Sequence, residues 1–282
     1  MWLVFAILSG AFYTAQGLFT RHILKEGKND AWAFSFYFSV VGALVSLPFF
    51  LTSIKIPGNV FSSYWLLMIL SGLLIVAQNL LIFKSANDLP ASISGAMTKF
   101  RLVWVFILGV IILKEIFNWQ KAVGTFFAVM AGIIILNKAK KLGSFEGISF
   151  VFLSTIFYAI IIVFYKYLFQ AFNSQSLTFF VFFIPAVINL AIMPNAFERI
   201  TIMAKSSGWS VFVACVFGAF ANLTMNYALS IGEASRVLVI IESFLVVTLV
   251  GEHLILKEKR HLKIKLLAVL MAIVGAVLIR LG

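Results

Sequence analysis

The stretch that decides the fold runs from Asp88 to Glu115 and reads DLPASISGAMTKFRLVWVFILGVIILKE. Its apolar part is long enough to cross a bilayer, because about 20 helical residues at 1.5 Å each span a hydrocarbon core of about 30 Å. Lys99 and Arg101 nevertheless lie near its middle. A charged side chain at that depth costs about 2.5–3.5 kcal/mol on insertion scales, so it faces protein or water and has a partner. We interpret the stretch as a membrane helix with one side in a polar interior.

The same design returns from Ile231 to Glu258, IGEASRVLVIIESFLVVTLVGEHLILKE, when the first copy is shifted by 143 residues. No gap is needed, and Lys99 falls on Glu242, an opposite charge at equivalent depth. The identical pairs include Ala91 and Ala234, Ser92 and Ser235, Leu113 and Leu256, Lys114 and Lys257, Glu115 and Glu258. Two copies of a membrane helix with opposite central charges indicate an internally duplicated transporter.

Composition excludes a soluble protein. The chain is 62% hydrophobic and 11% charged, with a mean hydropathy of +1.08, whereas soluble domains are about 25% charged. The net charge of +12 comes from Lys and Arg in short segments between apolar runs, which are typical of anchors to lipid headgroups and not of a nucleic-acid surface. Cys215 is the single cysteine, which excludes an intramolecular disulfide and argues against a metal site. No cofactor is expected.

The apolar runs predict an all-α, polytopic membrane protein with ten transmembrane helices. The expected spans are 2–21, 31–53, 62–84, 90–113, 119–137, 146–168, 176–194, 207–229, 233–256 and 263–281. Further matches support a duplication: Tyr13 with Tyr158 at an offset of 145, Asn79 with Asn222 at 143, and Gly132 with Gly275. Residues 1–140 and 145–282 are the predicted repeats of five helices each. An odd number of spans per repeat places the second copy upside down, as in many secondary transporters.

With these features the chain resembles EamA-type members of the drug/metabolite transporter superfamily, over essentially its whole length. The quoted motifs are Leu89-Pro90-Ala91-Ser92, Leu113-Lys114-Glu115, Gly124, Gly132, Glu233-Ala234-Ser235, Leu256-Lys257-Glu258 and Gly275. Lys114 and Lys257 depart from the family, which usually has Gly before this Glu, so the geometry of that turn is open. The resemblance implies alternating-access transport of a small metabolite through a central cavity. It also implies that the first, third and fourth spans of each half line the cavity, with the fifth and tenth spans peripheral.

The charged residues inside the spans have three open interpretations. Lys99 can pair with Glu242 across the pseudo-twofold axis as a structural gate, since buried charges need partners. Alternatively, Lys99 or Arg101 binds an anionic or carboxylate-bearing substrate. Arg101 can also extend toward a membrane interface. The two cations are 200° apart on an ideal helix, so at most one of them points directly into a cavity.

Uncharged polar residues complete the candidate site. Asn222 and Asn226 share one face of their span, and holding helices together is an equally good explanation for such residues. Tyr13 and Tyr158 lie at mid-span, away from the interfaces where tyrosine is common. The candidate substrate-binding residues are Tyr13, Gln16, Asn79, Lys99, Arg101, Tyr158, Asn222, Asn226 and Glu242. Glu115 and Glu258 end their spans and are expected to fix turns instead of carrying protons.

The sequence carries no HExxH, Walker or paired-carboxylate motif, so we expect no enzyme and no use of ATP. The preferred function is secondary transport in the plasma membrane of a prokaryote, with the lipid bilayer and a small molecule as partners. A flippase for a lipid-linked head group and a passive anion-selective channel are the alternatives. The oligomeric state is left open. Lys and Arg concentrate in the connections after odd-numbered spans, which favours termini outside the cell, whereas the family likeness places them inside.

Overall fold

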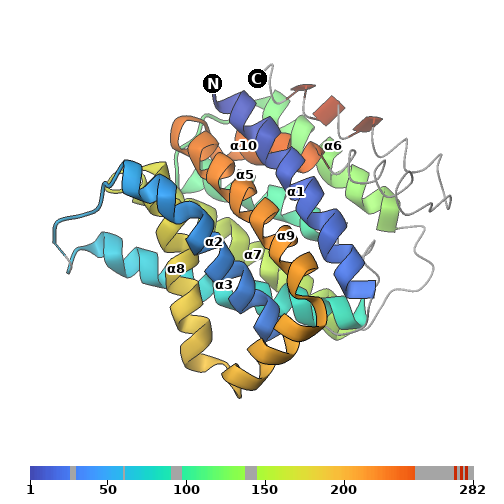
Figure 1. The fold of residues 1–282 in the computed structure, drawn as a ribbon. Helices are drawn as coiled ribbons and strands as arrows, with labels where there is room; N and C mark the ends of the chain where they lie inside the picture. Colours follow the sequence, from blue (N-terminus) through green and yellow to red (C-terminus); the bar gives the residue numbers. More distant parts are fainter. Residues whose placement is uncertain are drawn as a thin grey trace.

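The structure is a computed structural model that describes residues 1–25, 30–59, 61–89, 97–136 and 145–244, together with 270, 271, 274, 275, 277 and 278. The described segments are helices joined by short connections, with no strand among them (Figure 1). The first half contains α1 (Trp2–Lys25), α2 (Ala31–Thr52), α3 (Ser63–Asp88), the 3₁₀ helix η1 (Thr98–Phe100), α5 (Arg101–Ile111) and α6 (Trp119–Leu136). The second half contains α7 (Phe145–Leu168), α8 (Ser174–Ile192), α9 (Ala196–Ile231) and α10 (Ala234–Ser243).

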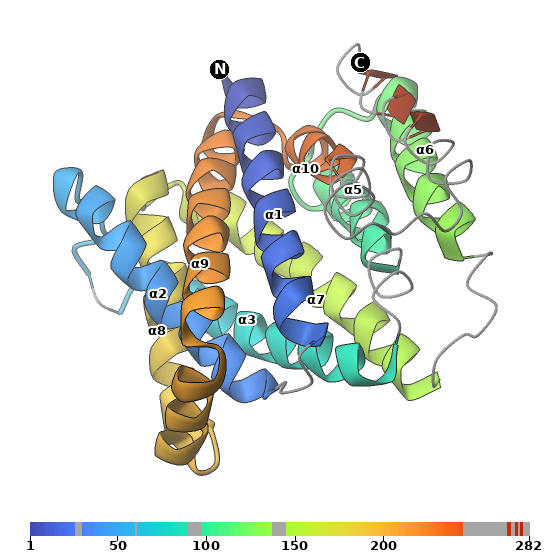
Figure 2. The same ribbon diagram turned by 45° about the vertical axis from the view of Figure 1, so that its right-hand side comes forward.

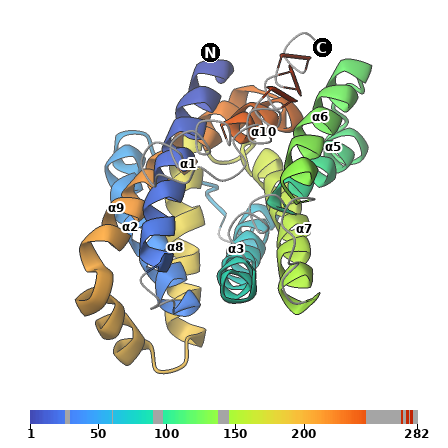
Figure 3. The same cartoon turned by 90° about the vertical axis from the view of Figure 1, so that its right-hand side faces the viewer.

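These helices agree with the expected spans, with two differences. The eighth span was expected to begin at residue 207, but α9 begins at Ala196 because its polar first turns are helical as well. Figure 3 shows that these first turns lie at an angle to the rest of α9. Within the fourth span, Thr98–Phe100 form the 3₁₀ helix η1 directly before α5, where a continuous α-helix was expected. The start of the fourth span, the second half of the ninth and most of the tenth lie outside the described residues.

Local chemistry fixes several helix starts. Asp30 is the N-cap of α2, and its carboxylate accepts hydrogen bonds from the amides of Trp32 at 3.0 Å and Ala33 at 3.2 Å. Asn173 caps α8 in the same way, through the amide of Ser176 at 2.8 Å. Such caps satisfy amides that have no partner within the helix. The two N-caps are 143 residues apart, which extends the sequence repeat to the second span of each half.

The helices pack in pairs that join the two halves. α1 lies beside α9, α3 beside α7, and α2 beside α8 (Figures 2 and 3). α1 starts at the end of the bundle where α7 finishes, so the first helices of the two halves run in opposite directions. We call this end, which holds Met1 and the connections after α2, α5, α7 and α9, the Met1 end. The connections after α1 and α8 lie at the opposite end.

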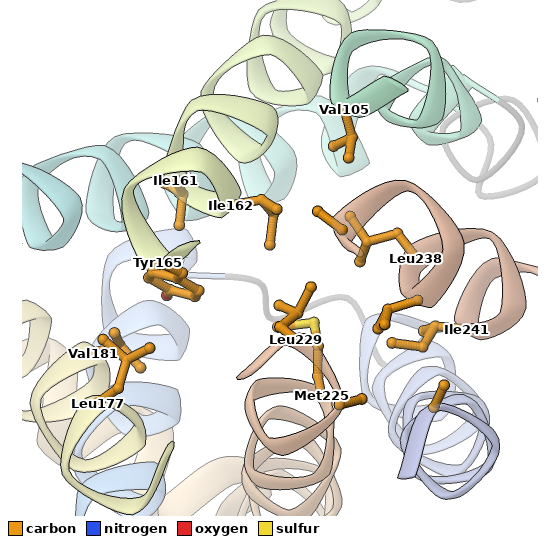
Figure 4. Packing of buried hydrophobic residues seen from close by; sticks show 14 of the residues in the cluster. Val105, Ile161, Ile162, Tyr165, Leu177, Val181, Met225, Leu229, Leu238 and Ile241 are labelled. Atoms are coloured by element: carbon orange, nitrogen blue, oxygen red, sulfur yellow. The ribbon is translucent and has the colours of Figure 1, made fainter. Parts of the chain in front are cut away.

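The outer surface of the bundle is apolar. Large side chains such as Ile111 (71% exposed), Trp119 (74%) and Phe126 (60%) face outward, as expected of a surface that contacts lipid. Among the described helices, five are long and apolar enough to cross a membrane: α2, α7, α8, and the segments Ser63–Ser85 and Trp209–Ile231. Buried side chains from α5, α7, α8, α9 and α10 fill the interior (Figure 4). This interior surrounds the candidate site.

Candidate functional site

A cavity of about 220 Å³ lies in the interior, between the two halves. Seven helices line it: α1, α2, α3, α5, α7, α8 and α9. The lining residues are Tyr13, Gln16, Phe38, Ser39, Ile75, Gln78, Asn79, Ile82, Phe83, Arg101, Tyr158, Ile161, Ile162, Tyr165, Val181, Phe182, Asn222 and Met225. The first, third and fourth spans of the first half contribute, as the family likeness implied. The second span of each half, α2 and α8, contributes as well, which had not been expected.

Helical spacing explains which residues face the cavity. On α7, Tyr158, Ile161, Ile162 and Tyr165 follow an i, i+3, i+4, i+7 spacing, which places them on one face. Tyr13 and Gln16 on α1 are three residues apart, and so are Asn222 and Met225 on α9. The cavity is therefore formed by one stripe of each helix.

Glu242 on α10 holds two cations. One carboxylate oxygen, Oε2, contacts the Lys99 ammonium, and the other, Oε1, contacts the Arg101 guanidinium. The side chains of Lys99 and Glu242 are 8% and 4% exposed, while Arg101 is 24% exposed. The 3₁₀ turn at Thr98–Phe100 changes the angular spacing of the cations from that of an α-helix, and Glu242 lies between them. The pairing of Lys99 with Glu242, suggested by the repeat, is present in the structure.

Only Arg101 of this triad lines the cavity. Its guanidinium lies 4.5 Å from the centre of the Tyr158 ring, a distance at which a cation is attracted to the face of the ring. The ion pair and the ring thus hold the guanidinium in one place. Lys99 and Glu242 lie behind it and orient it, while Lys99 also approaches the backbone oxygen of Glu242 at 3.4 Å.

The two symmetry-related tyrosines meet at one sulfur atom. The hydroxyls of Tyr13 and Tyr158 lie 3.7 Å and 3.5 Å from Sδ of Met225. A thioether is a weak acceptor, so a solute with a stronger acceptor can compete for both hydroxyls. Met225 was not predicted from the sequence. Met225 is three residues after Asn222 and therefore lies on the same face of α9, so helical spacing from Asn222 would have predicted it.

The asparagines have different environments. Asn79 lines the cavity and donates to the Ser35 hydroxyl at 3.4 Å, and Asn222 lines it while donating to the Gly218 carbonyl at 2.9 Å. Asn226 does not line the cavity. It is fully buried, and its amide donates to the Thr178 hydroxyl at 3.0 Å, which joins α9 to α8. Substrate binding by all nine candidates stays a prediction; the structure brings six of them to the cavity and places Lys99, Glu242 and Asn226 behind it.

A second hollow, of about 660 Å³, lies at the Met1 end between the connections after α5, α7 and α9. Glu115, which belongs to the first repeat, contacts the start of α10 in the second repeat. Its carboxylate accepts hydrogen bonds from the amide of Ala234 at 2.6 Å and from the Ser235 hydroxyl, so Glu115 caps α10. The Lys166 ammonium donates to the carbonyls of Leu229 at 2.9 Å and Gly232 at 2.8 Å. These polar groups join the connections at the Met1 end by binding one another.

Over the part of the chain that the structure describes, no cluster of three His, Cys, Asp or Glu residues could hold a metal ion. Cys215 is fully buried on α9.

The family model described as the EamA-like transporter family matches residues 1–137 and again residues 145–281. The chain belongs to this family. The resemblance drawn from the sequence is thereby confirmed, as is the expected class of an all-α, multi-pass membrane protein with inverted repeats. The family is described as one of transporters, which are not a class of enzymes.

Two further comparisons agree with that assignment. A protein of Archaeoglobus fulgidus described as an "Uncharacterized transporter" is 25% identical to this EamA-like transporter over 175 residues, which are 62% of this chain and 63% of that protein. A protein known from a crystal structure superposes with a TM-score of 0.76 at 13% identity, covering 99% of this chain and 98% of that one. At so low an identity, the second likeness supports the fold alone.

Proposed function

We propose that this chain is a secondary transporter that moves a small anionic metabolite, such as one with a carboxylate, by alternating access through the central cavity. The observation that carries the proposal is Arg101, whose guanidinium lines the cavity. A guanidinium has five N–H donors in a planar fork that suits carboxylate and phosphate groups. Glu242 contacts one nitrogen, NH2, and the Nε of Arg101 is buried without a hydrogen-bond partner among the described residues. Arg101 therefore retains donors for a second acid group.

The inverted repeats support alternating access. In such transporters the site lies at the interface between repeats, and one repeat moves against the other around it. Here polar contacts join the halves at both ends of the bundle. Glu115 reaches Ala234 at the Met1 end, while Arg199 and Asp30 pair at 3.1 Å at the opposite end. Contacts of this kind can open at one end while the other stays closed.

The size of the cavity supports a solute over a lipid-linked head group. Its volume of about 220 Å³ is below the roughly 300–1,000 Å³ of pockets that hold drug-sized ligands. The sequence has no Walker motif, so an ion gradient or the gradient of the substrate drives transport in this proposal. We place the protein in the plasma membrane of a prokaryote and assign it no catalytic activity.

A ligand screen followed by counterflow tests the proposal. Purified protein is first screened by thermal shift against organic acids, amino acids and nucleosides, and hits are then used as labelled probes in liposomes. We expect the hits to be anions. Arg101→Gln should weaken their binding by about 10- to 100-fold, since a hydrogen bond to a charged group contributes about 1.5–3 kcal/mol. Lys205→Gln is the control, because it removes an exposed cation of α9 that does not line the cavity, and it should retain binding.

The same liposomes separate a carrier from a channel. Unlabelled substrate inside the vesicle should accelerate uptake of the labelled anion by a carrier, because the loaded form reorients in both directions. Uptake without such stimulation would indicate a channel. Hits that are cationic, or that bind Arg101→Gln as tightly as the native protein, would refute the proposed site.

A further inference from the structure

The two repeats contribute the same positions to the cavity. With the offset of 145 for the first span and 143 for the others, six pairs have both members in the lining. They are Tyr13 and Tyr158, Gln16 and Ile161, Phe38 and Val181, Ser39 and Phe182, Asn79 and Asn222, Ile82 and Met225. The cavity is thus a duplicated structure, and its differences between halves are substitutions at equivalent places.

Polarity differs in two of these pairs, always in one direction. Gln16 and Ser39 of the first repeat stand opposite Ile161 and Phe182 of the second. Arg101 also lines the cavity from the first repeat, and its partner in the second is Phe244, which does not line it. At these positions the first repeat therefore supplies the charge and the extra amide and hydroxyl groups, while the second has apolar side chains; the polar lining residues of the second repeat are Tyr158, Tyr165 and Asn222.

Inversion of the repeats separates these groups along the bundle. α1 runs away from the Met1 end, so Gln16 lies about one turn farther from it than Tyr13. α7 and α9 run toward the Met1 end, so Ile161 and Ile162 lie nearer to it than Tyr158, and Met225 nearer than Asn222. Figure 4 shows Ile161, Ile162, Val181 and Met225 around one interior region.

We infer that the transported solute is an amphiphilic monoanion, a single acid group joined to an aliphatic or aromatic body. The acid group binds at Arg101, and the apolar body extends toward the Met1 end against Ile161, Ile162, Val181, Phe182 and Met225. The inference rests on the proposed function and narrows its substrate class. A second acid group on the same molecule would lie among these apolar side chains, where Tyr165 offers one hydroxyl and the described lining residues include no second cation, which disfavours dicarboxylates.

Chain length gives a quantitative test. Linear monocarboxylates from propanoate to hexanoate, and the dicarboxylates of the same lengths, are titrated onto the purified protein by calorimetry. Each added methylene should tighten monocarboxylate binding by about fourfold, until the cavity is filled. Dicarboxylates should bind at least about tenfold more weakly than monocarboxylates of equal length. Dicarboxylates that bind as tightly overturn this inference but leave the proposed function intact, provided that Arg101→Gln weakens them.

Exchanging residues between the repeats supplies matched variants. Ile161→Gln gives the second repeat the glutamine that the first repeat has at the equivalent position. It should reduce the gain in binding affinity per added methylene to below about twofold. Gln16→Ile, the reciprocal change, should keep the full gain. Val181→Thr changes polarity at nearly constant volume and serves if Ile161→Gln does not fold. An undiminished gain per methylene in folded Ile161→Gln, or in Val181→Thr if it is used instead, refutes the inference. Failure of every acid to bind through Arg101 refutes the proposed function itself.

Discussion

Glu242 is the residue on which the charge arrangement depends. It is 6% exposed and contacts both Lys99 and Arg101. One carboxylate neutralises one of these two positive charges and leaves the other uncompensated. Lys99 and Glu242 therefore have unequal roles, although they occupy equivalent positions in the two repeats.

Glu242→Gln should destabilise the protein far more than Lys99→Met. The first change leaves the buried Lys99 and the partly exposed Arg101 without a carboxylate, and breaking a buried pair in this way costs about 3–5 kcal/mol. The second leaves Arg101 and Glu242 as a one-to-one pair, for which we expect a loss below about 2 kcal/mol. Thermal unfolding of the detergent-purified variants measures the order. Equal midpoints would mean that Glu242 does not stabilise the cations.

Lys114 occupies the turn position at which the family usually has glycine. Its φ of 55° is in the left-handed region, where glycine is favoured. This conformation ends the helix and lets the amide of Glu115 donate to the Gly109 carbonyl at 3.0 Å. The turn keeps the geometry of a glycine-containing one although lysine occupies the position.

Lys114→Gly should therefore be neutral or stabilising, by up to about 1 kcal/mol, because the strain of a left-handed L-residue (about 1–2 kcal/mol) exceeds the entropic penalty of glycine. Lys114→Val should destabilise, since a branched side chain is disfavoured at positive φ. Asn195→Gly is the control at the other left-handed site, with φ 51°, where asparagine is already tolerated. Thermal midpoints that fall for Lys114→Gly would contradict this account.

At the scale of elements, α10 depends on a residue outside its own repeat. This helix has ten residues, and its own N-cap, Glu233, makes no side-chain capping hydrogen bond. Glu115 performs that role from the end of the fourth span and also brings a negative charge to the helix N-terminus. The cap of one helix is consequently a contact between halves.

Glu115→Ala should weaken closure of the Met1 end. Loss of a cap costs about 0.5–2 kcal/mol, and the contact between the fourth span and α10 is lost with it. Ser230→Cys, introduced with Cys215→Ala, reports access through its rate of reaction with an impermeant maleimide, which should rise. Glu146→Ala, an exposed acid in the first turn of α7, is the control and should leave the rate unchanged. An unchanged rate in Glu115→Ala would show that this contact does not hold the end closed.

Sequence reasoning was stronger on elements than on the site. Apolar runs and the offset of 143 located the helices, because length and repetition are properties of the chain alone. Lys99 and Arg101 both contact one carboxylate because a 3₁₀ turn lies at this point in the chain. The prediction assumed an ideal α-helix and therefore did not include this contact. Ile161, Val181 and Phe182 were missed because an apolar side chain that faces a cavity has the same composition as one that faces lipid. Only the position of a neighbour such as Tyr158 distinguishes them.

At the scale of the whole molecule, the distribution of Lys and Arg predicts how the bundle is inserted. In the sequence, the excess lies in the connections after odd-numbered spans, which alternate with the Met1 side in a chain of ten spans, and such residues in short connections tend to stay in the cytoplasm. We therefore expect the Met1 end to face outward. Gly58 lies in the connection after α2, with open space around a Cβ at that position, and Phe197 at the opposite end is 86% exposed.

In intact cells, Gly58→Cys should react with an impermeant maleimide, and Phe197→Cys should react only after permeabilisation. Both variants are made with Cys215→Ala, so that each protein has one thiol. The opposite pattern would show that the family orientation prevails over the charge distribution.

The unequal charges at the site have an electrical consequence. Lys99 and Arg101 carry two positive charges against the one carboxylate of Glu242. In the described part of the site, a bound monoanion makes the total zero, and an empty site keeps one positive charge. Membrane voltage then acts on reorientation of the empty carrier and not on that of the loaded one. Moving the one net charge across the membrane changes the free energy by up to about 2.3 kcal/mol per 100 mV. A cell with a negative interior would draw the empty site toward the cytoplasm, so the resting potential would set the side on which the carrier waits for substrate.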